Sequence, residues 1–234
     1  MNQHKIFFVI ITFFVSTQVS YGQKTEINLD VYSGSFSFTG KGATPNSFLV
    51  SSPFGSPTTS NPYGTKSGFS YAFEVQAQRI TKRKNIYGLG ISLEELTSKV
   101  SINGIVLSGV DVSNALAAKG KTELKNTFLT FNPFVGHRYS YNKVTFDILT
   151  GLDLAFCLES NENGTATANS IDLTAKSNRP KPSIDFRPRI QVKAEINKFG
   201  FLAGYSSGLT NYQNGNNPKV YSSFLRLGFS YLLK

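Results

Sequence analysis

The residue types that could carry out catalysis are few in this chain and lie far apart. A hydrolase of the serine type needs a histidine base and an orienting acid beside its nucleophile, and after residue 22 the only histidine is His137. Cys157 is the only cysteine, and we expect it to be a small packed side chain. Glu94 and Glu95 are adjacent, so on a strand they point to opposite faces. We therefore predict no catalytic, cofactor-binding or metal-binding residue.

Charged residues instead alternate with apolar ones, most clearly in the stretch SIDFRPRIQVKAEIN from Ser183 to Asn197. The stretch from Tyr221 to Lys234 repeats this two-residue period, which is typical of a β-strand whose two faces differ in polarity. Buried charges are tolerated chiefly when they are paired, so we interpret the charged face as a neutralising polar plug, with an ion path as the alternative. The predicted inward-facing residues are Glu74, Glu94, Asp147, Asp153, Arg187, Arg189, Lys193, Glu195 and Arg226.

The same alternation predicts eight strands. They cover about 27–38, 69–78, 87–94, 128–138, 144–158, 183–196, 199–207 and 221–234. In the first strand the apolar parity changes between Val31 and Tyr32, and a bulge near Ser33 would reconcile its two halves.

The connections between these strands alternate strictly in length. Those near 81–85, 139–143 and 197–200 are tight, and those near 40–67, 98–124, 159–183 and 208–219 are long and rich in Ser, Asn, Gly, Thr and Pro. In the second long loop, 112–119 is predicted to form a helical turn or two. The pattern favours an all-β fold, an eight-stranded antiparallel up-and-down transmembrane β-barrel with short periplasmic turns and long extracellular loops.

The first 22 residues have the features of a secretory signal peptide. Lys5 precedes an apolar run from Ile6 to Val15, and Ser20 and Gly22 provide the small residues before a cleavage point. We therefore expect a signal peptide at 1–22 and one barrel domain at 23–234. The run is about half of the roughly 20 residues that a membrane-spanning helix needs. Cleavage leaves 23 basic and 14 acidic residues, a net charge of +9.

This positive charge does not indicate a nucleic-acid partner. The basic residues are scattered over turns and loops without an aromatic-interleaved stripe. Those in or beside the long loops would attract anionic surface polymers or lipopolysaccharide phosphates. They are Lys66, Lys119, Lys121, Lys125, Lys176, Arg179, Lys181 and Lys219. We expect as partners outer-membrane lipid and lipopolysaccharide, and an unidentified surface or secretion partner.

Aromatic and apolar residues outside the strand cores give two further predictions. Amphipathic rings favour the membrane–water boundary. The predicted periplasmic girdle consists of Tyr87, Tyr139, Tyr141, Phe199 and Phe201. The long loops also contain apolar residues that pack over the barrel mouth or contact a partner, with packing favoured. These are Phe48, Leu49, Phe54, Tyr63, Ile105, Val106 and Leu107.

Three motifs resemble those of a known family. GYSSGLTNY at 204–212, with the terminal FLRLGFSYLL, resembles the last hairpin of the PorT-like outer-membrane β-barrel proteins of Gram-negative bacteria. NPFVGHRY and FDILTGLDLAF are similar to the central hairpin of that family. The resemblance implies an eight-stranded barrel over the mature chain, in the cell outer membrane, inserted by the barrel-assembly machinery. It implies no activity.

We thus predict a non-enzymatic outer-membrane barrel that has a structural role or interacts with the surroundings through its extracellular loops. The runner-up is a soluble exported lipocalin-like binding barrel, which requires an apolar interior and a wet outer face. A lipid-modifying outer-membrane enzyme is the third alternative. The polarity of the outer face separates the first two, because a membrane barrel has an apolar belt about 25 Å tall.

Overall fold

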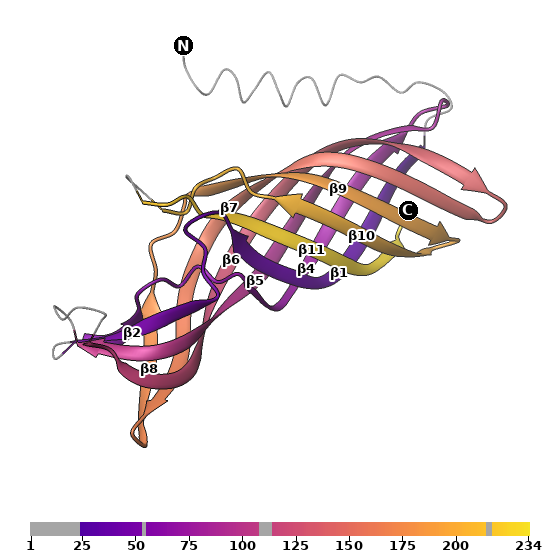
Figure 1. The fold of residues 1–234 in the computed structure, drawn as a ribbon. Helices are drawn as coiled ribbons and strands as arrows, with labels where there is room; N and C mark the ends of the chain where they lie inside the picture. The colour runs from indigo at the N-terminus through magenta and orange to yellow at the C-terminus, as the bar shows by residue number, and fades with distance from the viewer. Residues whose placement is uncertain (1–23, 53–54, 108–113, 214–216) are drawn as a thin grey trace, which may run out of the picture.

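The protein folds into a curved β-sheet that closes on itself (Figure 1). The computed structural model describes residues 24–52, 55–107, 114–213 and 217–234, so the predicted signal peptide lies outside the described residues. In this part of the chain the sheet has eleven strands. Eight of them form a ring in the order β1, β4, β5, β6, β7, β9, β10, β11, and β11 pairs back with β1. All ring pairs are antiparallel, which confirms the predicted eight-stranded barrel.

The ring strands include every stretch predicted from the alternation. They are β1 (Lys24–Thr39), β4 (Lys66–Ile80), β5 (Asn85–Leu107), β6 (Leu116–Tyr141), β7 (Val144–Ala168), β9 (Ile184–Ile196), β10 (Phe199–Ser207) and β11 (Tyr221–Leu232). No helix in the described residues is long and apolar enough to cross a membrane.

The three short turns lie together at one end of the barrel, beside the C-terminus (Figure 1). Each contains one non-glycine residue in the left-handed region: Lys84 with φ 63°, Asn142 with φ 52° and Asn197 with φ 56°. Asparagine tolerates this conformation better than most residues, which suits it to tight hairpins. By the rule that periplasmic turns are short, this end of the barrel is periplasmic.

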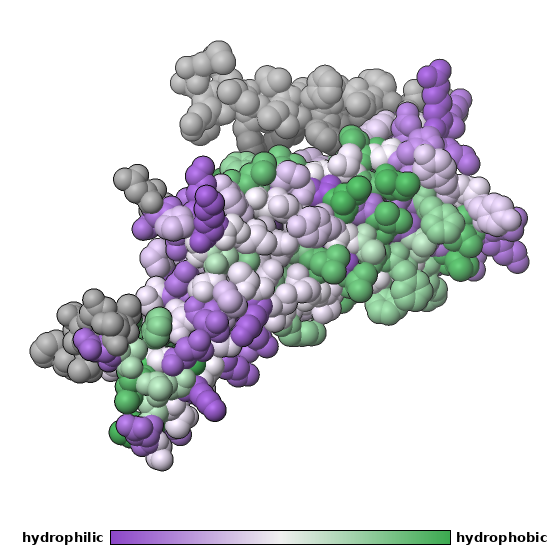
Figure 2. Space-filling view, viewed as in Figure 1, coloured by the Kyte–Doolittle hydropathy of each residue, from purple (hydrophilic) through white to green (hydrophobic). Residues whose placement is uncertain are grey.

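The outer face of the ring is apolar. Phe69 is 71% exposed, Leu227 62% and Phe229 64%. Soluble monomers rarely expose contiguous apolar patches of more than a few hundred Å². Figure 2 shows part of this belt over β10 and β11, with hydrophilic residues gathered at the two ends of the molecule. The lipocalin-like alternative requires the opposite arrangement, so the outer face argues against it.

Three ring strands continue far beyond the belt. β5, β6 and β7 have 23, 26 and 25 residues, whereas a tilted strand crosses a bilayer in about 9–11. Their far ends are joined by β2 (Asn46–Ser52), β3 (Gly55–Thr59) and β8 (Ile171–Asn178). β2 runs parallel to β5, β3 pairs with β2, and β8 pairs with β7. We call these three strands, with 98–107 of β5, 116–126 of β6 and 160–168 of β7, the extension (Figure 1).

The extension has a hydrophobic core of its own. The buried residues in it are Leu49, Val100, Ile102, Ile105, Ala118, Ala166, Ala168 and Ala175. Its outward positions on β6 and β7, among them Lys121, Asn163 and Thr165, are polar. The extension therefore has an apolar core and a largely polar outer face, the reverse of the barrel. Beside that core it also buries Thr59, Thr122 and Glu162, which are joined by hydrogen bonds.

This extension corrects the loop prediction. Much of 40–67, 98–124 and 159–183 is strand rather than irregular loop. The helical turn predicted at 112–119 is wrong from Leu116 onward, because β6 begins there, and its first two residues lie outside the described residues. Of the apolar loop residues, Leu49, Ile105 and Val106 are buried in the extension instead of over the barrel mouth, Tyr63 is buried in the aromatic cluster at the end of the bore, and Phe48 is partly buried. Phe54 and the side chain of Leu107 lie outside the described part.

The predicted bulge in β1 is also wrong. β1 pairs with β11 from Asn28 to Thr39 and with β4 from Lys24 to Phe36 without a register shift. Even-numbered residues point inward along the whole strand. What changes near Ser33 is the chemistry of the two faces, because the inner face passes from carboxylates to aromatic rings and the outer face from Leu and Val to Ser.

Candidate functional site

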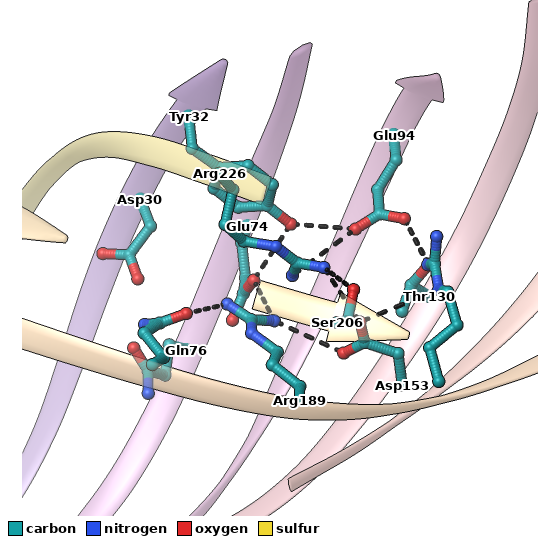
Figure 3. Close-up of polar contacts among 12 residues, drawn as sticks. Asp30, Tyr32, Glu74, Gln76, Glu94, Thr130, Asp153, Arg189, Ser206 and Arg226 are labelled. Carbon is teal, nitrogen blue, oxygen red and sulfur yellow. Dashed lines mark hydrogen bonds and ion pairs between the residues drawn. The ribbon is translucent and has the colours of Figure 1, made fainter. Parts of the chain in front are cut away.

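Four charged residues meet in the middle of the barrel bore. Arg187 donates a hydrogen bond through Nη2 to Glu94 Oε2. Arg226 Nη2 donates to Asp153 Oδ2 at 3.0 Å and to Ser206 Oγ at 2.6 Å. Both arginines are fully buried, and β9 and β11 direct them inward because they occupy the parity opposite the apolar belt. Figure 3 shows Glu94, Asp153 and Arg226 turned toward one another.

A second group lies beside this one and shares Tyr32. The Tyr32 hydroxyl contacts both Glu94 Oε1 at 3.0 Å and Glu74 Oε2 at 3.2 Å (Figure 3). Arg189 Nη1 donates to Glu74 Oε2 at 3.0 Å. The backbone leaves room for this carboxylate at Gly90, where a Cβ would lie 2.4 Å from Glu74 Oε1.

Two more clusters continue the network toward the short turns. Lys193 Nζ donates to Gln76 Oε1 at 2.7 Å and lies 3.1 Å from Asp30 Oδ2. Arg138 is bidentate to Glu26, with both bonds at 2.9 Å.

The same arginine is also bidentate to Asp147, with both bonds at 2.6 Å. All nine residues predicted to face inward therefore lie in the bore, and ion pairs or hydrogen bonds connect each of them to another charged group there.

Pairing within the bore does not balance the charges. In the described residues the barrel buries five cationic side chains and more carboxylates. The cations are Arg138, Arg187, Arg189, Lys193 and Arg226. The carboxylates are Glu26, Asp30, Glu74, Glu94, Asp147, Asp153, Asp185 and Glu195, which makes eight against five. Asp185 accepts from the hydroxyls of Tyr212 and Ser222 at 2.8 and 2.6 Å. Acidic side chains therefore outnumber the buried cations, and the exposed Lys24 pairs with Glu26 at 2.7 Å.

Aromatic rings close the bore at the end facing the extension. Phe38 packs edge-on against Tyr63 and Tyr212, with ring centroids 5.2 and 4.9 Å apart. Phe36 and Phe224 continue the stack. Burial raises the pKa of both tyrosines, which lie in connections outside the ring strands, so they remain neutral hydroxyls. Tyr63 donates to the Tyr212 backbone oxygen at 3.2 Å, tying two connections together.

One small cavity lies among the polar side chains of the bore. Its volume is about 10 Å³, and it lies against Gln76, Asn132 and Arg189. A water molecule needs at least about this volume. This space therefore holds no more than about one water.

The predicted girdle residues lie near the short turns, on β5, β6 and β10. Tyr139 and Tyr141 are 54% and 73% exposed, and Phe199 and Phe201 are 70% and 66% exposed. Tyr87 is partly buried. Phe199 and Phe201 contact Tyr231 and Phe229, with centroids 5.2 and 4.9 Å apart.

The residues considered for nucleophilic catalysis are far apart in the barrel. His137 lies near the short turns, and its Nδ1 is 3.0 Å from Asn85 Oδ1. Cys157 is buried beside the aromatic cluster, where its thiol donates to the Glu159 carbonyl.

The adjacent carboxylates are also separated. Glu94 is inside the bore and Glu95 on the outer face, where it pairs with Lys125 at 3.5 Å. Among the described residues, no group of three or more His, Cys, Asp or Glu side chains is placed to hold a metal.

Several residues of the network were missed from sequence. Arg138, Glu26, Asp30 and Tyr32 belong to it, and each occupies the inward parity of its strand. Arg138 is the last residue of the predicted strand 128–138 and shares the inward parity of Phe128 and Thr130, so the alternation itself places it inside. In β1, the change of apolar parity between Val31 and Tyr32 indicated a bulge, and with a bulge the series Glu26, Asn28, Asp30 is not continuous with the inward residues that follow it.

Comparisons with known proteins give only distant likenesses. No family model and no curated protein matches the chain. Among solved structures it is similar to Neisserial surface protein A, with 8% identity over 90% of this chain and 98% of that one, TM-score 0.37. The Ail protein of Yersinia pestis is 12% identical over 91% of this chain and 100% of that one, with a TM-score of 0.30. A major outer membrane protein of Thermus thermophilus is 13% identical over 88% of this chain and 99% of that one, with a TM-score of 0.38.

The chain's own geometry carries the assignment. Only helices and closed barrels satisfy all backbone hydrogen bonds inside a bilayer. This chain closes its ring through β1 and β11 and surrounds it with an apolar belt. It is an outer-membrane β-barrel. Its eight antiparallel strands and the contrast between short turns and a long opposite end match the pattern of that membrane.

Proposed function

We propose that the protein is a non-enzymatic, non-conducting outer-membrane barrel that holds the extension at the cell surface for interaction with other molecules. The observation that carries this proposal is the filled bore. Arg187, Lys193 and Arg226 are fully buried among carboxylates, and the aromatic rings lie across the same bore. A barrel of eight strands leaves an interior that its side chains can fill.

The extension supports the second part of the proposal. β5, β6 and β7 run from the barrel into it as continuous hydrogen-bonded strands, so it is a rigid projection rather than a set of loops. Rigid scaffolds commonly carry recognition on the segments they project. Membership in the PorT-like family, insertion by the barrel-assembly machinery and an unidentified surface or secretion partner belong to the same proposal.

A conductance measurement tests the first part. The refolded protein, inserted into planar lipid bilayers, should give no discrete ion-conducting events, because charged side chains and aromatic rings fill its bore. A porin inserted into the same bilayers is the control for insertion and detection. Regular channel events that scale with the amount of this protein would overturn the filled-bore proposal and favour the ion path.

A deletion tests the second part. Removing residues 51–61 takes away β3 and the Thr59 backbone N–H that donates to Glu162 Oε1 at 2.7 Å. Capture of a surface partner from intact outer membranes should be lost, while heat-modifiable gel migration shows that the barrel is still folded. If the variant captures the same proteins as the wild type, the extension is not the interaction surface.

A further inference from the structure

Four lysines cluster on the outer face where the barrel passes into the extension. Lys66 begins β4 and lies opposite Lys99 of β5 in the strand register. Lys121 and Lys125 of β6 lie opposite Ser101 and Thr97 of β5. Lys66 Nζ donates to Ser101 Oγ at 2.5 Å, which connects the cluster across β4, β5 and β6. We call these four residues the lysine cluster.

Carboxylates neutralise only part of this cluster. Glu123 lies 3.3 Å from Lys99 and 3.8 Å from Lys121, so one carboxylate serves two cations. Glu95 lies 3.5 Å from Lys125. Two carboxylates against four lysines leave two positive charges in excess. The lysine side chains in these pairs are 34–69% exposed, so their charged groups can reach a ligand.

The lysine cluster lies next to the apolar belt on the same strands. On β4, Phe69 follows Lys66 by three residues, which is about 10 Å of strand. On β6, Leu129 follows Lys125 by four residues, or about 13 Å. A molecule with an anionic head and acyl chains can therefore contact both surfaces at once.

The opposite side of the barrel lacks this arrangement. At outward positions on β1, β10 and β11 toward the extension, the described residues are Ser35, Ser37, Ser207 and Ser223. Exposed lysines do occur on that side, at Lys41, Lys181 and Lys219, but they lie in the connections and not on the outer face of a ring strand beside the belt. The lysine cluster differs from them because three neighbouring ring strands present its four members side by side.

A polar groove continues from the lysine cluster onto the extension. Lys121 and Glu123 form one end of it, and Asn163, Thr165 and Thr174 line the rest together with Gly164 and Ala175, around an open space of about 250 Å³. Its side chains are hydrogen-bond donors and acceptors of the kind that bind sugar hydroxyls. The order along the surface is therefore apolar belt, cationic cluster and polar groove.

We propose that β4, β5 and β6 bind a phosphorylated glycolipid of the outer leaflet, of the lipid A type. Its acyl chains lie against the belt around Phe69 and Leu129, its phosphates bind the lysine cluster, and its sugars extend toward the groove. Bilayer lipid supplies the occupant, because the site begins in the membrane belt. This inference rests on the proposed placement of the extension at the cell surface.

Native mass spectrometry of the detergent-solubilised protein tests the site with diphosphoryl lipid A as the probe. The variant Lys99→Gln/Lys121→Gln/Lys125→Gln should weaken binding about 100-fold, since each lysine near an anionic lipid surface contributes about one factor of five. The matched control, Lys82→Gln/Lys143→Gln/Lys198→Gln, removes the same charge from the three short turns. It should bind lipid A like the wild type.

Further measurements identify the ligand chemistry. Lipid A without phosphates should bind the wild type as weakly as diphosphoryl lipid A binds the cluster variant, and inorganic phosphate should not compete at equal concentration. Equal weakening in the cluster and control variants, or tight binding of dephosphorylated lipid A, would overturn the proposed site. Fractionation of the wild type separately tests surface placement: recovery outside the outer membrane defeats the proposed function without affecting the affinities measured in detergent.

Discussion

The barrel and the extension share three strands, but the polarity of their inner and outer faces is opposite. In the barrel, β5 directs Leu89, Ile91 and Leu93 outward and Ser92 and Glu94 inward. In the extension, the same strand directs Lys99 outward and Val100 and Ile102 inward. The direction of the side chains follows the regular alternation of a strand in both regions.

What differs is the medium on the outer side. Lipid surrounds the barrel, so apolar side chains face out and charges are placed where they can pair inside. Water surrounds the extension, so its apolar side chains form a core, as in a soluble sandwich. The reversal of polarity along one strand therefore marks where the chain leaves the membrane.

The largest effect is expected from breaking a buried pair in the bore. Arg226→Met removes the cation that contacts Asp153 and Glu94, and it leaves carboxylate charge buried without its partner. The free energy of unfolding should fall by about 3–5 kcal/mol. Urea titration of the protein refolded in lipid vesicles measures it. The matched variant Lys176→Met on the exposed face of the extension should change it by less than about 0.5 kcal/mol. Equal losses would show that burial in the bore is not the cause.

An arginine placed on the outer face should destabilise the barrel, where that face contacts lipid, but not the extension, where it contacts water. Leu227→Arg faces lipid, because Leu227 is 62% exposed within the belt, and should cost about 2–4 kcal/mol near the bilayer midplane. Thr165→Arg faces water on the extension and should cost little. The same titration in vesicles measures both. Ile190, which is 55% exposed on the same face, provides a second variant, Ile190→Arg. An unaltered free energy of unfolding in both arginine variants would contradict the lipid-facing assignment of the belt.

The sequence was most informative where the two faces differ most in chemistry. β9 and β10 were predicted to within a residue, because charged or small inward residues alternate there with large apolar ones. The inward positions of Glu74, Arg187 and Arg226 followed from the same contrast. Their partners across the ring could not be predicted, since a contact such as Arg189 to Glu74 depends on strand tilt and register around the whole barrel.

The extension was missed because its contrast is weak and reversed. Its inward residues include Gly164, Ala166 and Ala168, and its outward residues include Asn163 and Thr165, so the sequence reads as a flexible polar loop. Small side chains fit there because β3 and β8 close over the core of the extension. The prediction of a bulge in β1 was wrong for a related reason. The chemistry of its two faces changes near Ser33, and this change was interpreted as a shift of the backbone register.

The smallest effect is expected from a single methyl group in the core of the extension. Ile102 is 1% exposed and packs in the cluster with Leu49 and Ala166. Ile102→Val should destabilise this cluster by about 0.5–1.5 kcal/mol.

Because the barrel has separate clusters, the loss should remain local. Hydrogen exchange read by mass spectrometry should speed up by about two- to tenfold in peptides from β2 and β8 and stay unchanged in peptides from β10 and β11. The matched variant Ile91→Val removes the same group from the lipid-facing side of the same strand, where no packed core surrounds it. It should leave exchange in the extension unchanged. If Ile102→Val accelerated exchange in β10 and β11 equally, the extension and the barrel would open as one cooperative unit, and the boundary inferred from the reversal of polarity would not be a boundary in stability.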